Sequence, residues 1–217
     1  MKQILVKSGT VIVEDIPAPL VDDDGVLVEV AYSLVSTGTE ISGVVSSGKP
    51  LVQRALERPE QVVKILGYLR KLGIKKTFAK VQSSVNAGIP LGYSCSGIVI
   101  QVGQNIKDIQ PGEHVACAGA GLANHAEIVL VPRNLIVKIP DGCDLRDAAS
   151  VTLGSIAMQG VRRADTRLGE TVAVLGLGLL GQITVQLLKA SGCRVIGTDL
   201  DARRVALAKN LGLDFGF

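Results

Sequence analysis

The stretch at residues 171–199 constrains the fold of this chain more than any other part of the sequence. It reads TVAVL, then GLGLLG, then a helix-compatible run, and then RVIGTD. The glycines have the G-x-G-x-x-G spacing of a turn that follows a strand and opens a helix in a dinucleotide-binding βαβ unit. We therefore predict a strand, a tight turn, a helix that ends near Gly192 and a second strand that ends at Asp199.

Each glycine of the motif has a physical role. Gly176 allows the tight turn, Gly178 lets the backbone approach a pyrophosphate, and Gly181 lets the helix pack closely on the strand. Free N–H groups at the start of the helix then face the phosphates. The residues predicted to bind a cofactor along this turn are Gly176, Leu177, Gly178, Leu179, Leu180 and Gly181.

Asp199 predicts which dinucleotide is bound. It stands 18 residues beyond Gly181, where a carboxylate accepts hydrogen bonds from the adenosine ribose. This favours NAD(H) over NADP(H), although Arg203 and Arg204 follow and offer charge to a 2′-phosphate. In the alternative interpretation, the glycines only pack a helix on a sheet.

Composition excludes several classes of function. The 217 residues are 47% hydrophobic and 20% charged, a normal globular balance. A net charge of +3 and 3% aromatic residues argue against nucleic acid as a partner. The four cysteines are far apart and predict buried free thiols in a reducing compartment, hence a cytoplasmic protein. No apolar run is long enough to predict a membrane span.

The residues before the glycine motif read mainly as β structure. Apolar alternation between turn residues predicts a compact, barrel-like fold. Asp144 is placed to cap a short helix that runs to Ser150, and a second helical run reaches Ala164. The predicted strands are 4–6, 10–16, 25–36, 97–102, 113–118, 126–131 and 135–139.

Residues 49–85 interrupt this β pattern with three runs of helical apolar spacing. This predicted helical insertion holds nine basic residues against two acidic ones, a balance of +7. One interpretation is a docking surface for an anionic substrate or an acidic partner. The other is a set of solvated helix faces.

Four further landmarks accompany the glycine motif. They are Gly38-Thr39-Glu40, LGYSCSGIV at 91–99, PGEHV at 111–115 and AEIV at 126–129. Together they resemble the medium-chain dehydrogenase/reductase superfamily, which includes alcohol dehydrogenases and quinone reductases. The resemblance implies an α/β fold with a large β part: a GroES-like domain at 1–145, followed by the start of a doubly wound Rossmann domain at 146–217.

The resemblance also implies a function. We expect an NAD(H)-dependent oxidoreductase that transfers a hydride to or from a carbonyl or alcohol substrate. The segments around the insertion resemble a narrower group of bacterial two-part oxidoreductases, in which such a half is fused to one of the Gfo/Idh/MocA type. That likeness implies a sugar or nucleotide-sugar substrate, a missing C-terminal half or complementing chain, and a homo-oligomer at full length.

Departures from the family pattern bear on the mechanism. Thr37 stands where zinc-dependent members have their first cysteine ligand, Tyr93 and Ser94 replace a histidine and a glutamate, and the third ligand position falls near Val151. A Cys/His/Cys zinc site cannot be built from these residues, so we predict no zinc. Hydrogen-bond donors must then stabilise the reacting oxygen. The candidates are Tyr93, Thr37 and Ser36, and Ser155 is expected near the nicotinamide.

Two expectations complete the sequence reading. His125 precedes a strand and is predicted to be a surface or hydrogen-bonded structural residue, although it could reach a cleft. Only two of the six parallel strands of a dinucleotide domain are predicted before Phe217, so we expect a truncated chain or one half of a split enzyme. The alternative function is a non-catalytic module that binds an acidic partner or an anionic ligand.

Overall fold

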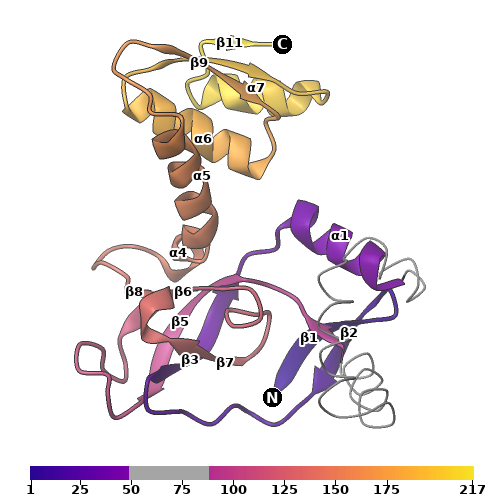
Figure 1. Cartoon of the computed structure of the whole chain (residues 1–217), viewed down its shortest axis with the longest axis vertical. Coiled ribbons are helices and arrows are strands. Elements are labelled where there is room, and N and C mark those ends of the chain that lie inside the picture. The colour runs from indigo at the N-terminus through magenta and orange to yellow at the C-terminus, as the bar shows by residue number, and fades with distance from the viewer. Residues whose placement is uncertain (49–87) are drawn as a thin grey trace, which may run out of the picture. The chain divides into compact units, whose positions relative to one another are not determined.

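The computed structural model describes residues 1–48 and 88–217. The chain divides into two compact units, Met1–Ala149 and Ser150–Phe217 (Figure 1); the sequence analysis places this boundary after residue 145. The predicted insertion at 49–85 lies outside the described residues. Among the helices of the described part, none has the length and apolar character needed to cross a membrane.

A five-stranded antiparallel sheet forms the centre of the first unit, with the order β7-β3-β5-β6-β8. Between β3 and β5 the register shifts at Leu27/Val28 and again at Val30/Tyr32. Such bulges bend and twist a strand, which curls the sheet. Its strands are β3 (Gly25–Ser33), β5 (Ser94–Val102), β6 (His114–Ala118), β7 (Ile128–Pro132) and β8 (Ile136–Lys138).

The alternation that predicts these strands also fills their core. Val26 and Val28 on β3 are fully buried, as are Val115 on β6 and Val131 on β7. Burying a valine side chain contributes about 1.5–3 kcal/mol, so this cluster is a major source of stability for the first unit. A one-residue slip would turn these side chains to the opposite face, so burial also fixes the register.

A smaller antiparallel sheet has the order β2-β1-β4. β1 (Lys2–Lys7) and β2 (Thr10–Asp15) form a hairpin whose turn residues Ser8 and Gly9 have φ of 48° and 81°. Two positive φ values are typical of the tight hairpin turn that matches strand twist. β4 is Ile89–Pro90, and a bridge between Gln3 and Ala126 joins β1 to the segment before β7.

Helix α1 (Thr37–Gly48) follows β3 and is absent from the sequence prediction. Its sequence, TGTEISGVVSSG, holds three glycines and several β-branched residues, which are poor helix formers. Tertiary contacts support it instead. The Ser47 hydroxyl accepts a hydrogen bond from the Gly9 N–H at 3.0 Å, which attaches the end of α1 to the β1–β2 turn.

The predicted cap at Asp144 is confirmed. Its carboxylate accepts from the Arg146 N–H at 2.8 Å and starts the short helix α4 (Leu145–Ala148). Two hydroxyls of β5 attach α4 to the sheet: Ser94 donates to the Ala149 carbonyl at 2.6 Å, and Ser96 donates to the Leu145 carbonyl. Both serines are buried. Their hydroxyls supply donors to backbone carbonyls at the end of the first unit.

The second unit is a parallel three-stranded sheet with the order β11-β10-β9. The prediction of only two strands is wrong, because the short β11 also pairs with β10. Gly192 and Gly212 have positive φ just after two of the helices, and the sequence predicts the helix end at Gly192. The elements are α5 (Val151–Arg163), β9 (Thr171–Leu175), α6 (Leu179–Ala190), β10 (Arg194–Thr198), α7 (Ala202–Asn210) and β11 (Phe215–Gly216).

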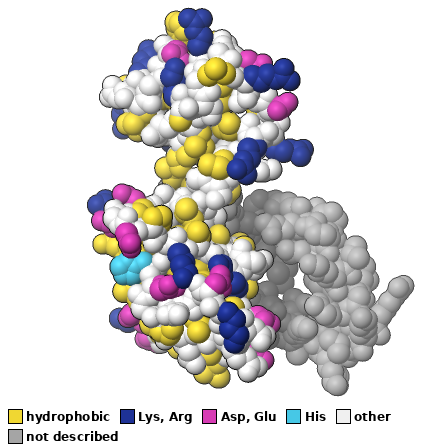
Figure 2. Space-filling view, turned by 90° about the vertical axis from the view of Figure 1, so that its left-hand side faces the viewer, with side chains coloured by type: hydrophobic (Ala, Val, Ile, Leu, Met, Phe, Trp, Pro, Cys, Tyr) yellow, Lys and Arg dark blue, Asp and Glu magenta, His cyan; other side chains and the backbone are white. Residues whose placement is uncertain are grey.

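Charges on the described residues of the first unit are mixed rather than of one sign. Arg133 pairs with Asp108, and Lys138 pairs with Glu113. Hydrogen bonds from these cations lower the pKa of the Asp108 and Glu113 carboxyls. Figure 2 shows basic and acidic side chains interspersed on one face of the molecule, unlike the single-sign surface typical of nucleic-acid binding.

The cysteine prediction is correct for three residues and wrong for one. All four thiols are free; Cys95, Cys117 and Cys193 are buried, whereas Cys143 is exposed. Cys143 lies in the segment between β8 and α4, outside the strands and helices. Cys95 and Cys117 are cross-strand neighbours on β5 and β6, and the hydrogen bond with Cys95 together with burial raises the pKa of the Cys117 thiol.

Candidate functional site

The glycine turn of the second unit has the conformation that its sequence predicts. Gly176 follows β9 with φ of 90°, a region that disfavours other residues. A side chain at Gly181 would place its Cβ 2.1 Å from the Gly176 carbonyl oxygen, so only glycine lets α6 lie this close to the turn. By contrast, an added Cβ at Gly176 or Gly178 would meet nothing within 4 Å.

The start of α6 is therefore an open cradle. Gly178 is the N-cap residue and supplies no side-chain hydrogen bond to the first turn of the helix. The early N–H groups of a helix need an acceptor and carry the positive end of its dipole, which suits a phosphate. Leu179 and Leu180, the first residues of α6, are exposed, whereas the Leu177 side chain is fully buried in the core of the second unit.

Asp199 closes the turn from the end of β10. Its Oδ2 accepts from the Leu177 N–H at 2.7 Å, and its Oδ1 accepts from the Asp201 N–H at 2.9 Å. These bonds, led by the one from Asp201, lower the pKa of the Asp199 carboxyl, and Arg204 adds to the effect. An ionised carboxylate has about four acceptor sites, so it retains capacity to accept from ribose hydroxyls.

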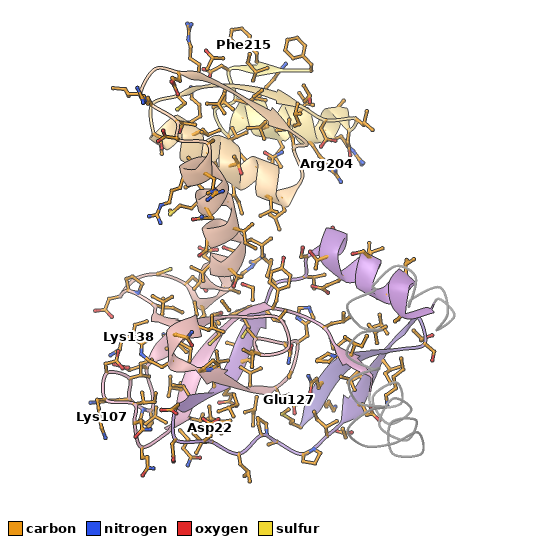
Figure 3. The ribbon with its side chains drawn as sticks, viewed as in Figure 1. Asp22, Lys107, Glu127, Lys138, Arg204 and Phe215 are labelled. Atoms are coloured by element: carbon orange, nitrogen blue, oxygen red, sulfur yellow. The ribbon has the colours of Figure 1, made fainter. Side chains whose placement is uncertain are left out.

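The two arginines near Asp199 differ in their contacts. Arg204, on α7 (Figure 3), has its Nη1 3.6 Å from Asp199 Oδ2. Arg203 pairs with Asp201 at 2.9 Å, and its side chain is 92% exposed. Arg203 therefore lies on a solvated face of α7, whereas Arg204 belongs to the surroundings of the carboxylate.

Gln182 supports the same turn and is not identified by the sequence motif. Its side-chain amide donates to the Leu177 carbonyl at 2.9 Å and to the Arg204 carbonyl at 2.9 Å. It is buried, and its Oε1 has no hydrogen-bond partner. Gln182 thus links the glycine turn to α7 from within α6. Its position one residue after Gly181 is the only sequence signal that could have indicated this role.

Ser155 is not joined to this turn by any hydrogen bond in the structure. It lies on α5 and is exposed, and its hydroxyl donates to the Val151 carbonyl at 2.9 Å within the same helix. Back-bonding of this kind is common for serine in helices. The expected proximity of Ser155 to the nicotinamide therefore remains a prediction.

The predicted catalytic residues lie at two neighbouring places in the first unit. Ser36 precedes α1, and its N–H donates to Glu40 Oε1 at 2.9 Å. Thr37 is the exposed first residue of α1. Tyr93 is half-buried, and its carbonyl accepts from the Gly119 N–H at 3.0 Å. Their chemical roles stay predictions, but the structure shows what lies between these two places.

His125 joins them. Its Nδ1 lies 2.8 Å from Ser33 Oγ, and its Nε2 lies 3.2 Å from both carboxylate oxygens of Glu40. The ring also packs against Gly92, the residue before Tyr93, where an added Cβ would lie 3.0 Å from His125 Cγ. The expectation of a hydrogen-bonded histidine is confirmed, and that of a surface position is wrong, because His125 is 5% exposed.

Sequence reasoning missed this Ser33–His125–Glu40 cluster. The pairs are separated by 92 and 85 residues, and no spacing rule connects them. The landmark Gly38-Thr39-Glu40 marks the Glu40 position through family resemblance only. A serine, a histidine and a carboxylate in hydrogen-bonded series form an arrangement that can accept and hold a proton.

The described residues do not gather a metal-binding set. Within 1–48 and 88–217, no three His, Cys, Asp or Glu side chains are placed to hold one ion. At the positions where the family resemblance implies zinc ligands, the Ser94 hydroxyl is bonded to a carbonyl and Thr37 offers only a hydroxyl. Neither of these two positions supplies a thiolate or an imidazole for zinc, and the absence of zinc remains a prediction.

Comparison with curated proteins connects the chain to dehydrogenases, although no protein-family model matches it. It is 36% identical over 126 residues to D-guloside 3-dehydrogenase of Shigella flexneri, covering 58% of this chain and 36% of that enzyme. It is 29% identical over 153 residues to sorbitol dehydrogenase of Bos taurus, covering 58% of this chain and 43% of that enzyme. The chain thus spans less than half the length of either relative.

Solved structures show the same fold. Galactitol-1-phosphate dehydrogenase from Escherichia coli has a TM-score of 0.77 and 20% identity, covering 100% of this chain and 61% of that chain. Quinone oxidoreductase from Escherichia coli, solved with NADPH, has a TM-score of 0.72 and 16% identity, covering 100% and 58%. The α/β fold with a curled, GroES-like sheet is therefore confirmed.

The solved structures show the fold that the resemblance to medium-chain dehydrogenases and reductases implies. The relatives are named dehydrogenases, which supports an oxidoreductase. They leave the choice between NAD and NADP and the question of zinc to the residues of this chain.

Proposed function

We propose that the protein is an NAD(H)-dependent, zinc-independent oxidoreductase that transfers a hydride between nicotinamide and a hydroxyl or carbonyl carbon of a sugar or polyol. The observation that carries this proposal is the glycine turn closed by Asp199. Its open cradle at Gly178 and its anchored carboxylate fit the two ends of an adenosine pyrophosphate. The likeness to sugar and polyol dehydrogenases supports the substrate class.

Four features of the turn would hold the cofactor. The N–H groups at the start of α6 would bind the pyrophosphate, Gly178 would leave room for it, and Asp199 would accept from the ribose hydroxyls. Gln182 keeps the turn in place through its hydrogen bonds to the Leu177 and Arg204 carbonyls. The bound nicotinamide would supply the hydride acceptor or donor. Asp199 disfavours a 2′-phosphate by charge repulsion, and Arg204 only partly offsets this because it already faces the carboxylate.

The proposal of zinc independence rests on the donor set. Hydroxyls stand at the implied ligand positions Thr37 and Ser94, and hydroxyls are weak ligands for zinc. Stabilisation of the reacting oxygen would then come from hydrogen-bond donors such as Tyr93, Thr37 and Ser36. Activity that persists unchanged after prolonged treatment with a chelator would support this; a loss that added zinc restores would contradict it.

The remaining expectations about the whole protein are part of the same proposal. They are a cytoplasmic location, a homo-oligomer, and a second half of the Gfo/Idh/MocA type or a complementing chain, with no nucleic-acid partner. The sequence segments on either side of residues 49–85 support the fused arrangement by resemblance. The basic balance of those residues is compatible with an anionic sugar derivative as substrate.

Calorimetric titration of the full-length protein with NADH and with NADPH tests the function. We expect NADH to bind at least tenfold more tightly, a difference of about 1.4 kcal/mol. Gly178→Val should abolish binding and leave the thermal midpoint unchanged, since the added side chain meets no protein atom within 4 Å of its Cβ. Tighter NADPH binding would refute the choice of NAD, and binding that survives Gly178→Val would refute the pyrophosphate site.

A further inference from the structure

The Ser33–His125–Glu40 cluster brings together three separate elements of the first unit. Ser33 is the last residue of β3, Glu40 lies in the first turn of α1, and His125 lies just before β7. The hydrogen-bonding distances are 2.8 Å from Ser33 Oγ to His125 Nδ1 and 3.2 Å from His125 Nε2 to Glu40. The order of groups is hydroxyl, imidazole and carboxylate.

The chemistry of these groups assigns their protons. An ionised carboxylate only accepts, so Nε2 of His125 carries the hydrogen that points to Glu40. Nδ1 then has a lone pair and accepts the hydrogen of the Ser33 hydroxyl. The Ser36 N–H donates to Glu40 Oε1 at 2.9 Å, which holds the carboxylate in place. The network thereby fixes one tautomer of the histidine.

The three side chains of the cluster differ in their exposure to solvent. His125 is 5% exposed and Glu40 is 9% exposed, so both are enclosed by protein. Ser33 is the partly exposed member. Gly92 leaves the space that the imidazole fills, and Tyr93 follows directly. Ser33 is therefore the most exposed of the three cluster residues, and we take it as the one that a ligand would meet.

We propose that Ser33, His125 and Glu40 form the proton relay of this protein, with Ser33 as the group that contacts the substrate hydroxyl. The proposal rests on the proposed function, since it supplies the proton path that hydride transfer needs. Ser33 is thus a catalytic residue, and His125 and Glu40 are positioning residues that act through it.

The step balances as follows in the direction of alcohol oxidation. A bound oxidised nicotinamide would accept the hydride from the substrate carbon, and the substrate O–H proton would pass to Ser33 Oγ. The proton of the Ser33 hydroxyl passes to Nδ1 of His125, and the substrate C–O bond becomes a carbonyl. Glu40 stabilises the imidazolium, which releases its proton to water after product leaves. Carbonyl reduction runs the same transfers in reverse.

A purely structural role would have different consequences. The hydrogen bonds would then only hold α1 in place, and removing the Ser33 hydroxyl would alter stability without changing the rate of the chemical step. A relay predicts a change in kcat with little change in KM or thermal midpoint, because general acid and base catalysis contributes about 10²–10⁴-fold to rate.

The kinetic test uses the full-length protein with its sugar or polyol substrate. Ser33→Ala should lower kcat about 100-fold, and Ser33→Thr, which keeps the hydroxyl, should restore it to within about tenfold of the original. His125→Gln should match Ser33→Ala, since an amide cannot take the proton. Ser42→Ala is the control, because this exposed serine on α1 bonds only to carbonyls of its own helix, and it should keep full activity.

A second readout does not depend on turnover. In ¹⁵N spectra of histidine-labelled protein, assigned with His125→Gln, Nε2 of His125 should be protonated and Nδ1 should be an unprotonated acceptor. Glu40→Gln should abolish that preference. The opposite tautomer in the original protein would overturn the relay.

The outcomes separate the two proposals. If no alcohol or sugar supports reduction of NAD or NADP, the proposed function is refuted and the relay with it. If turnover occurs and Ser33→Ala keeps the original kcat, the relay alone is refuted. A loss of kcat in Ser33→Ala that Ser33→Thr restores supports both.

Discussion

The two candidate sites of this molecule are built in opposite ways. The glycine turn of the second unit comes from 171–199, and its decisive contacts join residues of one local βαβ unit. The Ser33–His125–Glu40 cluster of the first unit joins residues separated by 92 and 85 positions. The glycine turn can be recognised from its sequence spacing, whereas the cluster forms only when α1 packs beside the β1–β2 hairpin and the end of β3 and the segment before β7 come together. A local motif thus reveals the cofactor site and is silent about the acid–base groups.

The largest effect on stability is expected from a substitution at Gly181, because the space around Gly181 and Gly178 differs. A valine at Gly181 would force its Cβ against the Gly176 carbonyl, 2.1 Å away, whereas Gly178 faces open space. Gly181→Val should therefore lower the free energy of unfolding by about 3 kcal/mol or more. Chemical denaturation of both variants measures this. Equal stabilities would show that α6 does not pack as closely on the turn as the structure places it.

The second prediction exchanges one buried polar residue in each site for leucine. Gln182→Leu removes the side-chain donor to two carbonyls, and His125→Leu removes the donor to Glu40 and the acceptor of the Ser33 hydroxyl. Each change should cost about 1–3 kcal/mol of stability. Their functional effects should differ: Gln182→Leu weakens NADH binding, and His125→Leu lowers kcat while NADH affinity is retained. Titration calorimetry and steady-state kinetics separate them.

If Gln182→Leu left NADH affinity unchanged, the support of the turn from α6 would be irrelevant to binding. If His125→Leu weakened NADH binding as strongly as Gln182→Leu, the two sites would not be independent in the way that the comparison assumes.

The third prediction concerns acid. The hydrogen bond from Lys189, followed by that from the Val195 N–H, lowers the pKa of Asp214 below its ordinary value of 3.8. A carboxyl whose folded pKa is depressed stabilises the fold above its unfolded pKa and loses that contribution as pH falls through the folded value. Asp214→Asn should therefore lower the thermal midpoint at pH 7, and the difference should shrink as pH falls below 3.8 and vanish below the folded pKa.

Scanning calorimetry at a series of pH values provides this measurement. The matched change in the first unit is Glu113→Gln, because Lys138 likewise lowers the pKa of the Glu113 carboxyl. The two variants should lose their effects over the same acidic range. A difference that persists at low pH would mean that the carboxylates do not stabilise the fold through their charge.

The smallest effect is chemical. Cys143 is the exposed thiol of the four, so native protein should react rapidly with a thiol reagent at this residue alone, and Cys143→Ser should remove the rapid phase. Cys117, whose pKa is raised by Cys95 and by burial, should react only on unfolding because the thiolate is the nucleophile. The order in which Cys193 and the Cys95–Cys117 pair then react shows which unit opens first. Rapid reaction at Cys117 in native protein would contradict its burial.

Much of the fold follows from local pattern. Alternating valines predict β3 and β7, Asp144 predicts the start of α4, and the glycines predict the turn before α6. The failures have physical causes: α1 contains glycines and β-branched residues that oppose a helix, and it forms because it can attach to the β1–β2 turn through Ser47. The strand β11 has two residues and carries no periodicity that a pattern could show.

By itself, the sequence determined the cofactor turn, because the G-x-G-x-x-G spacing and Asp199 lie within one contiguous unit whose geometry is fixed by backbone sterics. It also determined the family resemblance and the absence of zinc-ligand residue types at the matching positions. Only the tertiary structure decided that Ser33, Glu40 and His125 meet, that Gln182 secures the turn and that His125 is enclosed. The physical reason is that burial and long-range hydrogen bonds depend on how distant segments pack, and no local spacing encodes that packing.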